Sequence, residues 1–155
     1  MNFMDIRMRL RYDGTEMMDA GKGEVENMPQ TILVVEDDRD INEVVTEYMK
    51  DAGYIVISCV SGSTAQTMIG RNSTIDLFIL DIMLPAVSGL ELLKQIRTVE
   101  SHRDKPVLML TALDDEATQI LSFDELAADY VVKPFSPKVL VKRVEKLFRF
   151  RQPDS

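Results

Sequence analysis

The sequence contains little cysteine, little histidine and no long apolar run. Cys59 is the single cysteine among 155 residues, and His102 is the single histidine. One cysteine cannot form a disulfide within the chain, and without Cys or His partners it cannot build a structural zinc site. No stretch approaches the roughly 20 apolar residues of a membrane-spanning helix, and the amino-terminal residues lack the apolar segment of a signal peptide. We therefore expect a cytoplasmic protein, in a reducing compartment and with no membrane partner.

Positive charge is also in short supply. The chain has 18 Lys and Arg against 26 Asp and Glu, a net charge of −8. Such an excess of negative charge repels a phosphate backbone unless basic residues gather on one face, so this domain is not expected to bind nucleic acid by itself. The remaining composition, 45% hydrophobic and 28% charged, is that of one globular domain with some chain left over.

Residues 1–30 hold neither a 3.6-residue nor a 2-residue apolar period for more than one turn, which indicates a flexible extension. The codons for Gly23 and Glu24 can contain a ribosome-binding sequence shortly before Met28. Residues 1–27 are therefore either a translated leader or a native extension. We expect the folded domain over residues 31–150 and the start of a linker or tail over residues 151–155.

From residue 31 onward, short apolar runs alternate with amphipathic segments. The expected strands are residues 32–35, 54–60, 77–80, 107–110 and 130–132. The expected helices begin at the cap Asp38, cover 64–70, follow Gly89, cover 116–123 and run from Pro137 to about Phe150. Five strands alternating with five helices predict an α/β fold, a five-stranded parallel sheet doubly wound by helices on both faces.

Polar side chains stand where four of these strands end. Glu36 and Asp37 follow the first strand, Asp81 the third, Thr111 the fourth, and Lys133 the fifth. Carboxyl ends of parallel strands meet at one edge, where ligands of such sheets bind. Clustered carboxylates favour a hard divalent cation such as Mg²⁺, while a lysine and a hydroxyl beside it can bind a phosphoryl group. Asp81 is then a candidate phosphoacceptor, because carboxylates form acyl phosphates.

Four segments at these spacings resemble the receiver domains of two-component response regulators, which have the flavodoxin-like (CheY-like) fold: TILVVEDD (31–38), DLFILDIMLPAVSGLELL (76–93), PVLMLTA (106–112) and ADYVVKPFSP (128–137). The resemblance covers Thr31 to about Phe150 and implies phosphorylation of Asp81 by a sensor histidine kinase. The implied Mg²⁺ ligands are Asp37, Asp81, the backbone carbonyl of Met83 and, through water, Glu36. The implied phosphoryl contacts are Thr111 and Lys133, the implied switch residues are Thr111 and Tyr130, and the Lys133–Pro134 bond is expected to be cis.

The segments MLPAVSG and KPFSP look most like the OmpR/PhoB-type transcription-factor branch. That resemblance implies control of transcription, with DNA bound only through an effector domain that this chain lacks. It also implies a switching face made of residues 116–123, 130–132 and 137–150, through which a homodimer is expected. Glu125, Asp129 and Arg143 keep part of the branch's charged pattern on that face. The alternative is a stand-alone or hybrid-kinase receiver that acts by protein–protein contacts.

Other classes fit the strand ends less well. A flavodoxin would place the FMN phosphate where Glu36, Asp37 and Asp38 would repel it. A haloacid-type phosphatase needs an aspartate two residues after its nucleophile, and Met83 occupies that place. With no general acid for turnover, the acyl phosphate is expected to be a stored state and the protein not an enzyme. A receiver that cannot be phosphorylated is disfavoured, because every group of the site is present.

Three remaining expectations concern single positions. Cys59 is predicted to be a small buried hydrophobe of the second strand, and His102 a solvated loop residue. The family commonly has a glycine before the fifth strand, where this chain has Leu126, Ala127 and Ala128. If a positive φ is needed there, the loop should differ from that of the family.

Overall fold

The computed structural model describes residues 28–112 and 127–150. Its strands form one parallel sheet in the order β2-β1-β3-β4-β5. They are β1 (Thr31–Val35), β2 (Ile55–Cys59), β3 (Leu77–Asp81), β4 (Val107–Thr111) and β5 (Asp129–Val132). The expected doubly wound, CheY-like fold is confirmed. The expected extension of residues 1–30 falls almost entirely outside the described residues, as do the helix over 116–123 and the tail over 151–155.

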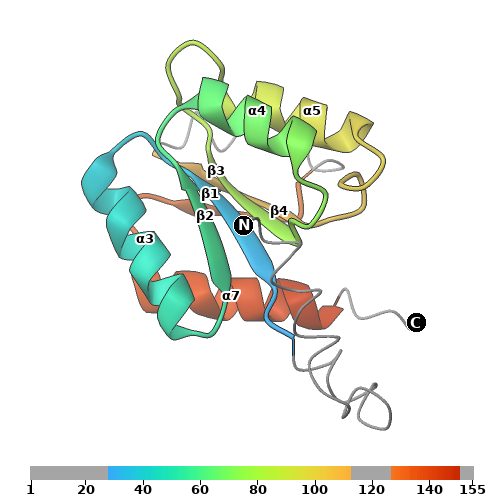
Figure 1. The fold of residues 1–155 in the computed structure, drawn as a ribbon. Coiled ribbons are helices and arrows are strands. Elements are labelled where there is room, and N and C mark those ends of the chain that lie inside the picture. Colours follow the sequence, from blue (N-terminus) through green and yellow to red (C-terminus); the bar gives the residue numbers. More distant parts are fainter. Residues whose placement is uncertain (1–27, 113–126, 151–155) are drawn as a thin grey trace, which may run out of the picture.

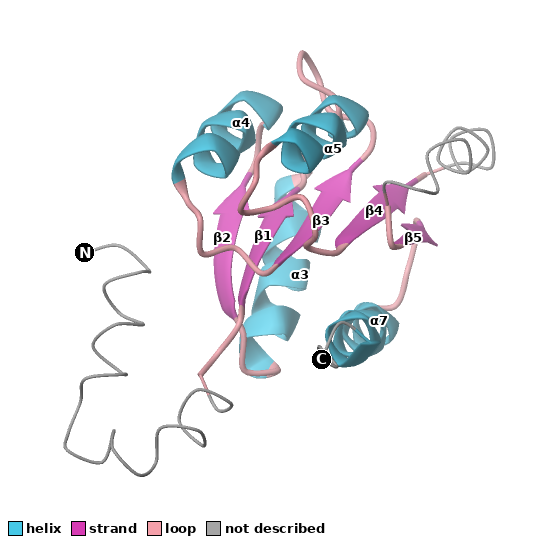
Figure 2. Ribbon diagram, turned by 90° about the vertical axis from the view of Figure 1, so that its right-hand side faces the viewer, coloured by secondary structure: helices cyan, strands magenta, loops and turns pink. Residues whose placement is uncertain are grey.

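Helices cover both faces of the sheet (Figures 1 and 2). On one face lie α4 (Gly62–Arg71) and α5 (Gly89–Thr98), and on the other lie α3 (Arg39–Asp51) and α7 (Pro137–Phe150). Alternate residues of the central strands therefore enter two cores. In β1, Leu33 and Val35 join the core under α4 and α5, whereas Ile32 and Val34 join the core under α3 and α7.

The helix ends follow local signals. The Asp38 side chain accepts hydrogen bonds from the backbone N–H groups of Asp40 at 3.0 Å and Ile41 at 3.2 Å, as expected of an N-cap. Gly53 follows the same helix with φ of 102°, a conformation that glycine adopts without strain. Ser136 accepts from the Val139 N–H at 3.3 Å at the start of α7, which begins at Pro137 as predicted.

The prediction for His102 was wrong. The residue is fully buried, because the loop after α5 folds back so that the imidazole packs edge-on against Phe78, with the ring centroids 5.3 Å apart. Its Nε2 lies 2.9 Å from the carbonyl oxygen of Ile69 at the end of α4. Burial lowers the pKa of His102, so the neutral form is favoured.

Other single-residue expectations can also be compared. Cys59 is buried as predicted, and burial raises the pKa of its thiol to about 11, so it is unreactive. The Lys133–Pro134 bond is cis as expected. Among the described non-glycine residues only Ala86 has a positive φ, so Ala127 and Ala128 adopt ordinary backbone conformations. No helix in the described ranges is long and apolar enough to cross a membrane.

Candidate functional site

The ends of β1 and β3 bring three carboxylates together. Val35 pairs with Leu80 in the parallel register, so Glu36 and Asp81 leave the sheet side by side. Carboxylate oxygens of Glu36, Asp37 and Asp81 all lie within 4.8 Å of one another. Glu36 and Asp81 are buried, whereas Asp37 is exposed. The cluster predicted at this edge therefore exists, with one carboxylate facing solvent.

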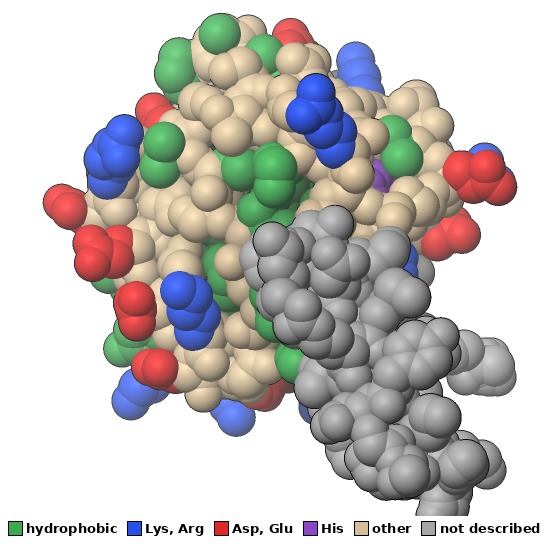
Figure 3. All heavy atoms as spheres, in the orientation of Figure 1, with side chains coloured by type: hydrophobic (Ala, Val, Ile, Leu, Met, Phe, Trp, Pro, Cys, Tyr) green, Lys and Arg blue, Asp and Glu red, His purple; other side chains and the backbone are tan. Residues whose placement is uncertain are grey.

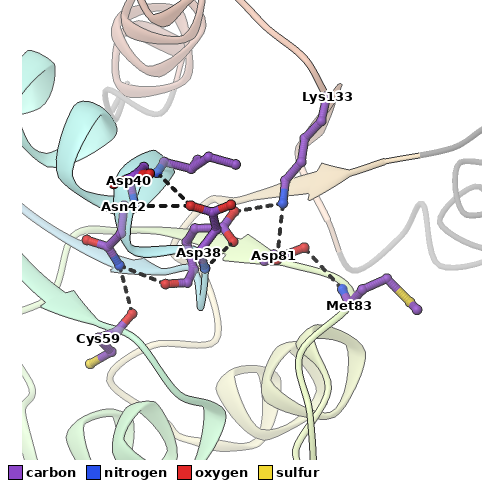
Figure 4. Close-up of polar contacts among 9 residues, drawn as sticks. Asp38, Asp40, Asn42, Cys59, Asp81, Met83 and Lys133 are labelled. Atoms are coloured by element: carbon purple, nitrogen blue, oxygen red, sulfur yellow. Dashed lines mark hydrogen bonds and ion pairs between the residues drawn. The ribbon is translucent and has the colours of Figure 1, made fainter.

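Lys133 follows β5 at the same edge of the sheet and reaches two of these carboxylates (Figure 4). Its Nζ lies 2.8 Å from Oε1 of Glu36 and 3.2 Å from Oδ2 of Asp81. Thr111 is buried at the end of β4, and its carbonyl accepts from the Lys133 N–H at 2.6 Å. The structure therefore places the predicted lysine directly on the acidic cluster and the predicted threonine on the adjoining strand.

Burial and mutual repulsion set the protonation of this cluster. Burial raises the pKa of Glu36 to about 7, the nearby charge of Asp81 adds to this, and the contact with Lys133 opposes it. Burial alone would lower the pKa of Lys133, but its contacts with Glu36 and Asp81 outweigh that effect and raise it. The candidate metal-ligand atoms are all carboxylate oxygens. The single ammonium of Lys133 does not balance the charge of three carboxylates. Such a set fits Mg²⁺, which prefers carboxylate and carbonyl oxygens.

The loop after β3 also contacts the cluster. The backbone N–H of Met83 donates to Oδ1 of Asp81 at 3.1 Å, while the Met83 side chain is 62% exposed. At Ala86, φ is 69° and the Val87 N–H donates to the Pro85 carbonyl at 2.8 Å, which together form a strained γ-turn. The segment that carries the expected carbonyl ligand thus binds Asp81 at Met83 and is followed by a tight turn at Ala86.

Two predicted features of the switching face are described. Tyr130 is half-buried and packs against the core under α4 and α5. Arg143 on α7 donates to both carboxylate oxygens of Asp129, at 2.8 and 2.9 Å, within the same chain. Glu125 lies outside the described residues. The roles of Tyr130 as a switch and of this face in dimerisation stay predictions.

Sequence reasoning missed Asn42. Its side chain is buried in α3 and binds the main chain at the ends of both β1 and β2. The signal was present, because Asn42 precedes Val45 and Met49 at the i, i+3 and i+7 positions of the buried stripe of that helix. A polar residue in such a stripe needs hydrogen-bond partners.

The space-filling view of one face shows a further property of the surface (Figure 3). On that face, the acidic and basic side chains of the described residues are interspersed. This arrangement does not give that face a continuous basic surface for a phosphate backbone.

Fold and site together define an α/β domain with an acidic site, crossed by a lysine, at the carboxyl edge of its sheet. The family model of the response regulator receiver domain matches residues 32–145. The chain belongs to this family, whose members are phosphoacceptor domains and not enzymes.

Curated relatives and solved structures support the same family assignment. The regulatory protein VanRB of Enterococcus faecalis is 48% identical over 118 residues, which are 76% of this chain and 52% of that protein. The phosphate regulon transcriptional regulatory protein PhoB of Pseudomonas aeruginosa is 36% identical over 124 residues, 80% of this chain and 54% of that protein. The chain thus spans about half the length of these curated relatives.

Among solved structures, a putative response regulator from Chloroflexus aurantiacus superposes with a TM-score of 0.71 at 37% identity, covering 79% of this chain and 99% of that one. DrrB of Thermotoga maritima, an OmpR/PhoB homologue, superposes with a TM-score of 0.67 at 31% identity, covering 79% and 54%. The resemblance to the OmpR/PhoB branch is confirmed at the level of homology.

Proposed function

We propose that Asp81 accepts a phosphoryl group from the phosphohistidine of a sensor histidine kinase. The observation that carries this proposal is the position of Asp81, which is buried at the sheet edge with Lys133 Nζ at 3.2 Å and two more carboxylates beside it. A structural carboxylate would need one partner. This one has a cation, a backbone N–H and two like charges, which is an arrangement for binding an incoming group.

In the proposed step a carboxylate oxygen of Asp81 attacks phosphorus. The new P–O bond forms as the P–N bond to the donor imidazole breaks, and the imidazole leaves with the electron pair and takes up a proton. Lys133 and the Thr111 hydroxyl bind the phosphoryl oxygens, over which the negative charge of the transferred group is spread. Because Met83 stands where a haloacid-type phosphatase has its second aspartate, we expect the acyl phosphate to be kept as a signal.

The same edge is proposed to hold Mg²⁺. Its ligands would be Asp37, Asp81 and the backbone carbonyl of Met83, with Glu36 binding through water. When bound, the ion supplies charge compensation for the phosphoryl oxygens and the carboxylates. Asp37 is exposed and so open to an ion from solvent, while the buried Glu36 helps to set the local charge.

A surface beside the site suits the kinase. An apolar groove of about 230 Å³ opens next to Lys133 and is lined chiefly by Ile41, Val44, Pro134 and Phe135. A phosphohistidine can reach Asp81 only if the protein that carries it covers the rim of the site. We assign this groove to an apolar helix face of the donor.

The output is proposed to be transcriptional. Two relatives that share this domain are named transcriptional regulatory proteins, and both are about twice as long as the match. In this proposal phosphorylation repacks residues 116–123, β5 and α7, promotes a homodimer through that face, and acts on DNA through an effector domain in a longer chain. The alternative output is contact with another protein by a stand-alone or hybrid-kinase receiver.

We propose that the receiver domain covers residues 31–150, between an extension and a linker, and that the protein is located in the cytoplasm.

Intact mass after incubation with acetyl phosphate and Mg²⁺ tests the proposal. The wild type should gain one phosphoryl group, and Asp81→Asn should gain none. Asp76→Asn is the matched control, because Asp76 precedes the same strand at its opposite end and binds the Thr31 N–H. It should gain the group normally. Phosphorylation of Asp81→Asn, or of the wild type in excess EDTA, would show that the site is wrongly assigned.

A further inference from the structure

Asn42 is a buried amide that uses its whole hydrogen-bonding capacity. Its side chain is 3% exposed. Nδ2 donates to the carbonyl of Glu36 at 3.0 Å and to the carbonyl of Cys59 at 2.9 Å. Oδ1 accepts from Ser58 Oγ at 2.5 Å and from Thr46 Oγ1 at 3.2 Å. An asparagine amide has two donor hydrogens and two acceptor lone pairs, so none is left over.

These partners also define which way the amide points. Both atoms near Nδ2 are carbonyl oxygens, which only accept, and both atoms near Oδ1 belong to hydroxyl groups. Turning the amide around would put Oδ1 against two carbonyl oxygens. The side chain is therefore locked in one orientation.

The locked amide sits at the point where the sheet ends and the site begins. Figure 4 shows Asn42 joined to Cys59 on the side of α3, with Lys133 approaching the acidic cluster separately. The Glu36 N–H donates to the Cys59 carbonyl at 3.1 Å. This hydrogen bond lies directly after the last paired residues of β1 and β2, Val35 and Cys59. Asn42 then binds the carbonyls of both Glu36 and Cys59, so it closes the β1–β2 ladder immediately before Asp37.

The hydrogen bonds of Asn42 hold the backbone at a place where neighbouring charges repel one another. Three carboxylates within 4.8 Å repel one another, and Glu36 is held among them with no exposure. Repulsion alone would move the Glu36 backbone away from Asp81. The hydrogen bonds from Asn42 oppose that movement without adding any group to the site itself.

We propose that Asn42 is a positioning residue for the metal and phosphoryl site, acting through the main chain of Glu36. This inference rests on the proposed function. Asn42 touches neither the ion nor the phosphoryl group, and it sets where Glu36 and Asp37 stand before either arrives. Removing a residue that orients metal ligands typically lowers the metal affinity by roughly 10- to 100-fold.

The test is the dissociation constant of Mg²⁺ alone, measured by titration calorimetry on the full chain. Asn42→Ala should raise it at least about tenfold. Ser58→Ala is the matched control, because it removes a bond to the same amide and leaves both carbonyl bonds intact. Val144→Ala, in the core under α7, controls for lost stability. Both controls should stay within about twofold of the wild type. An unchanged constant in Asn42→Ala, or equal weakening in all three variants, would overturn the proposal.

A measurement on the wild type does not depend on any variant folding. Coupling between two sites is reciprocal, so saturating Mg²⁺ should slow solvent exchange of the Asn42 Nδ2 hydrogens seen by NMR. An unchanged exchange rate would refute the role of Asn42. Phosphorylation of the wild type by acetyl phosphate is followed in parallel. Its absence refutes the proposed function, whereas a phosphorylated wild type with unchanged Mg²⁺ affinity in Asn42→Ala refutes the positioning role alone.

Discussion

Gly89 packs directly against the main chain of Asp81. A Cβ atom at Gly89 would lie 2.2 Å from the Asp81 carbonyl oxygen and 2.8 Å from Cα of Ile82. The Gly89 N–H also donates to the Ile82 carbonyl at 3.1 Å. The start of α5 is thus seated on the backbone of the proposed phosphoacceptor, at a distance that excludes any side chain.

Gly89→Ala should therefore lower the free energy of unfolding by about 2 kcal/mol or more, since backbone atoms must move to admit the methyl group. It should also slow phosphorylation of Asp81. Gly70→Ala is the control, because Gly70 lies in α4 and a methyl group there would come no closer than 3.9 Å to the side chain of Gln95. That change should stabilise by up to about 1 kcal/mol through helix propensity. Urea unfolding of both variants decides the matter, and similar values for the two would contradict the close packing.

Ala86 predicts an effect of opposite sign. Its φ of 69° costs an alanine about 1 kcal/mol or more, a strain that glycine does not have. Ala86→Gly should raise the free energy of unfolding by up to about 1 kcal/mol, after the larger chain entropy of glycine is subtracted. Ala52→Gly tests the reasoning, because Ala52 is also exposed and outside a helix but has φ of −82°. It should destabilise by roughly 0.4–1 kcal/mol. Destabilisation by both changes would contradict strain at Ala86.

His102 predicts a dependence of stability on acid. Burial holds the folded-state pKa below the ordinary 6.5, so between these two values the unfolded chain binds more protons. The contribution of His102 is complete above pH 6.5 and is lost as pH falls through the folded-state pKa, by at most about 1.4 kcal/mol per pH unit. The raised pKa of Glu36 acts in the opposite sense over part of this range.

The measurement that isolates His102 is the difference in unfolding free energy between wild type and His102→Leu across pH 5–8. Glu36 contributes equally to both proteins and cancels. The advantage of the wild type should shrink as the pH falls below 6.5. A difference that stays constant with pH would mean that the folded protein protonates His102 as readily as the unfolded chain does.

Thr111→Ala separates phosphorylation from switching. Thr111 is buried at the end of β4, next to β5, which carries Tyr130. Without its hydroxyl, Asp81 should still accept a phosphoryl group, but Tyr130 and α7 should not repack. Amide NMR spectra of phosphorylated wild type and variant over residues 129–150 provide the comparison. Shifts as large in the variant as in the wild type would remove Thr111 from the switch.

Much of the architecture was predictable because it rests on local patterns. Runs of three to seven residues marked every strand within one position at each end, and Asp38, Ser136 and Pro137 marked helix starts correctly. The polar residues at strand ends were predictable for a related reason. Parallel strands place their carboxyl ends at one edge, so the contact between Asp81 and Lys133 could be predicted although they are 52 residues apart.

What escaped prediction depends on packing between distant segments. A histidine between charged neighbours looks solvated until the loop after α5 is seen to fold onto Phe78 and Ile69. The place of Asn42 on the stripe of Val45 and Met49 indicates burial, but its hydrogen-bond partners are defined only when two strand ends are brought beneath it. Periodicity reports which side of an element is apolar, but burial and hydrogen-bond partners are decided by whatever other segment arrives there, and that information exists only in the folded chain.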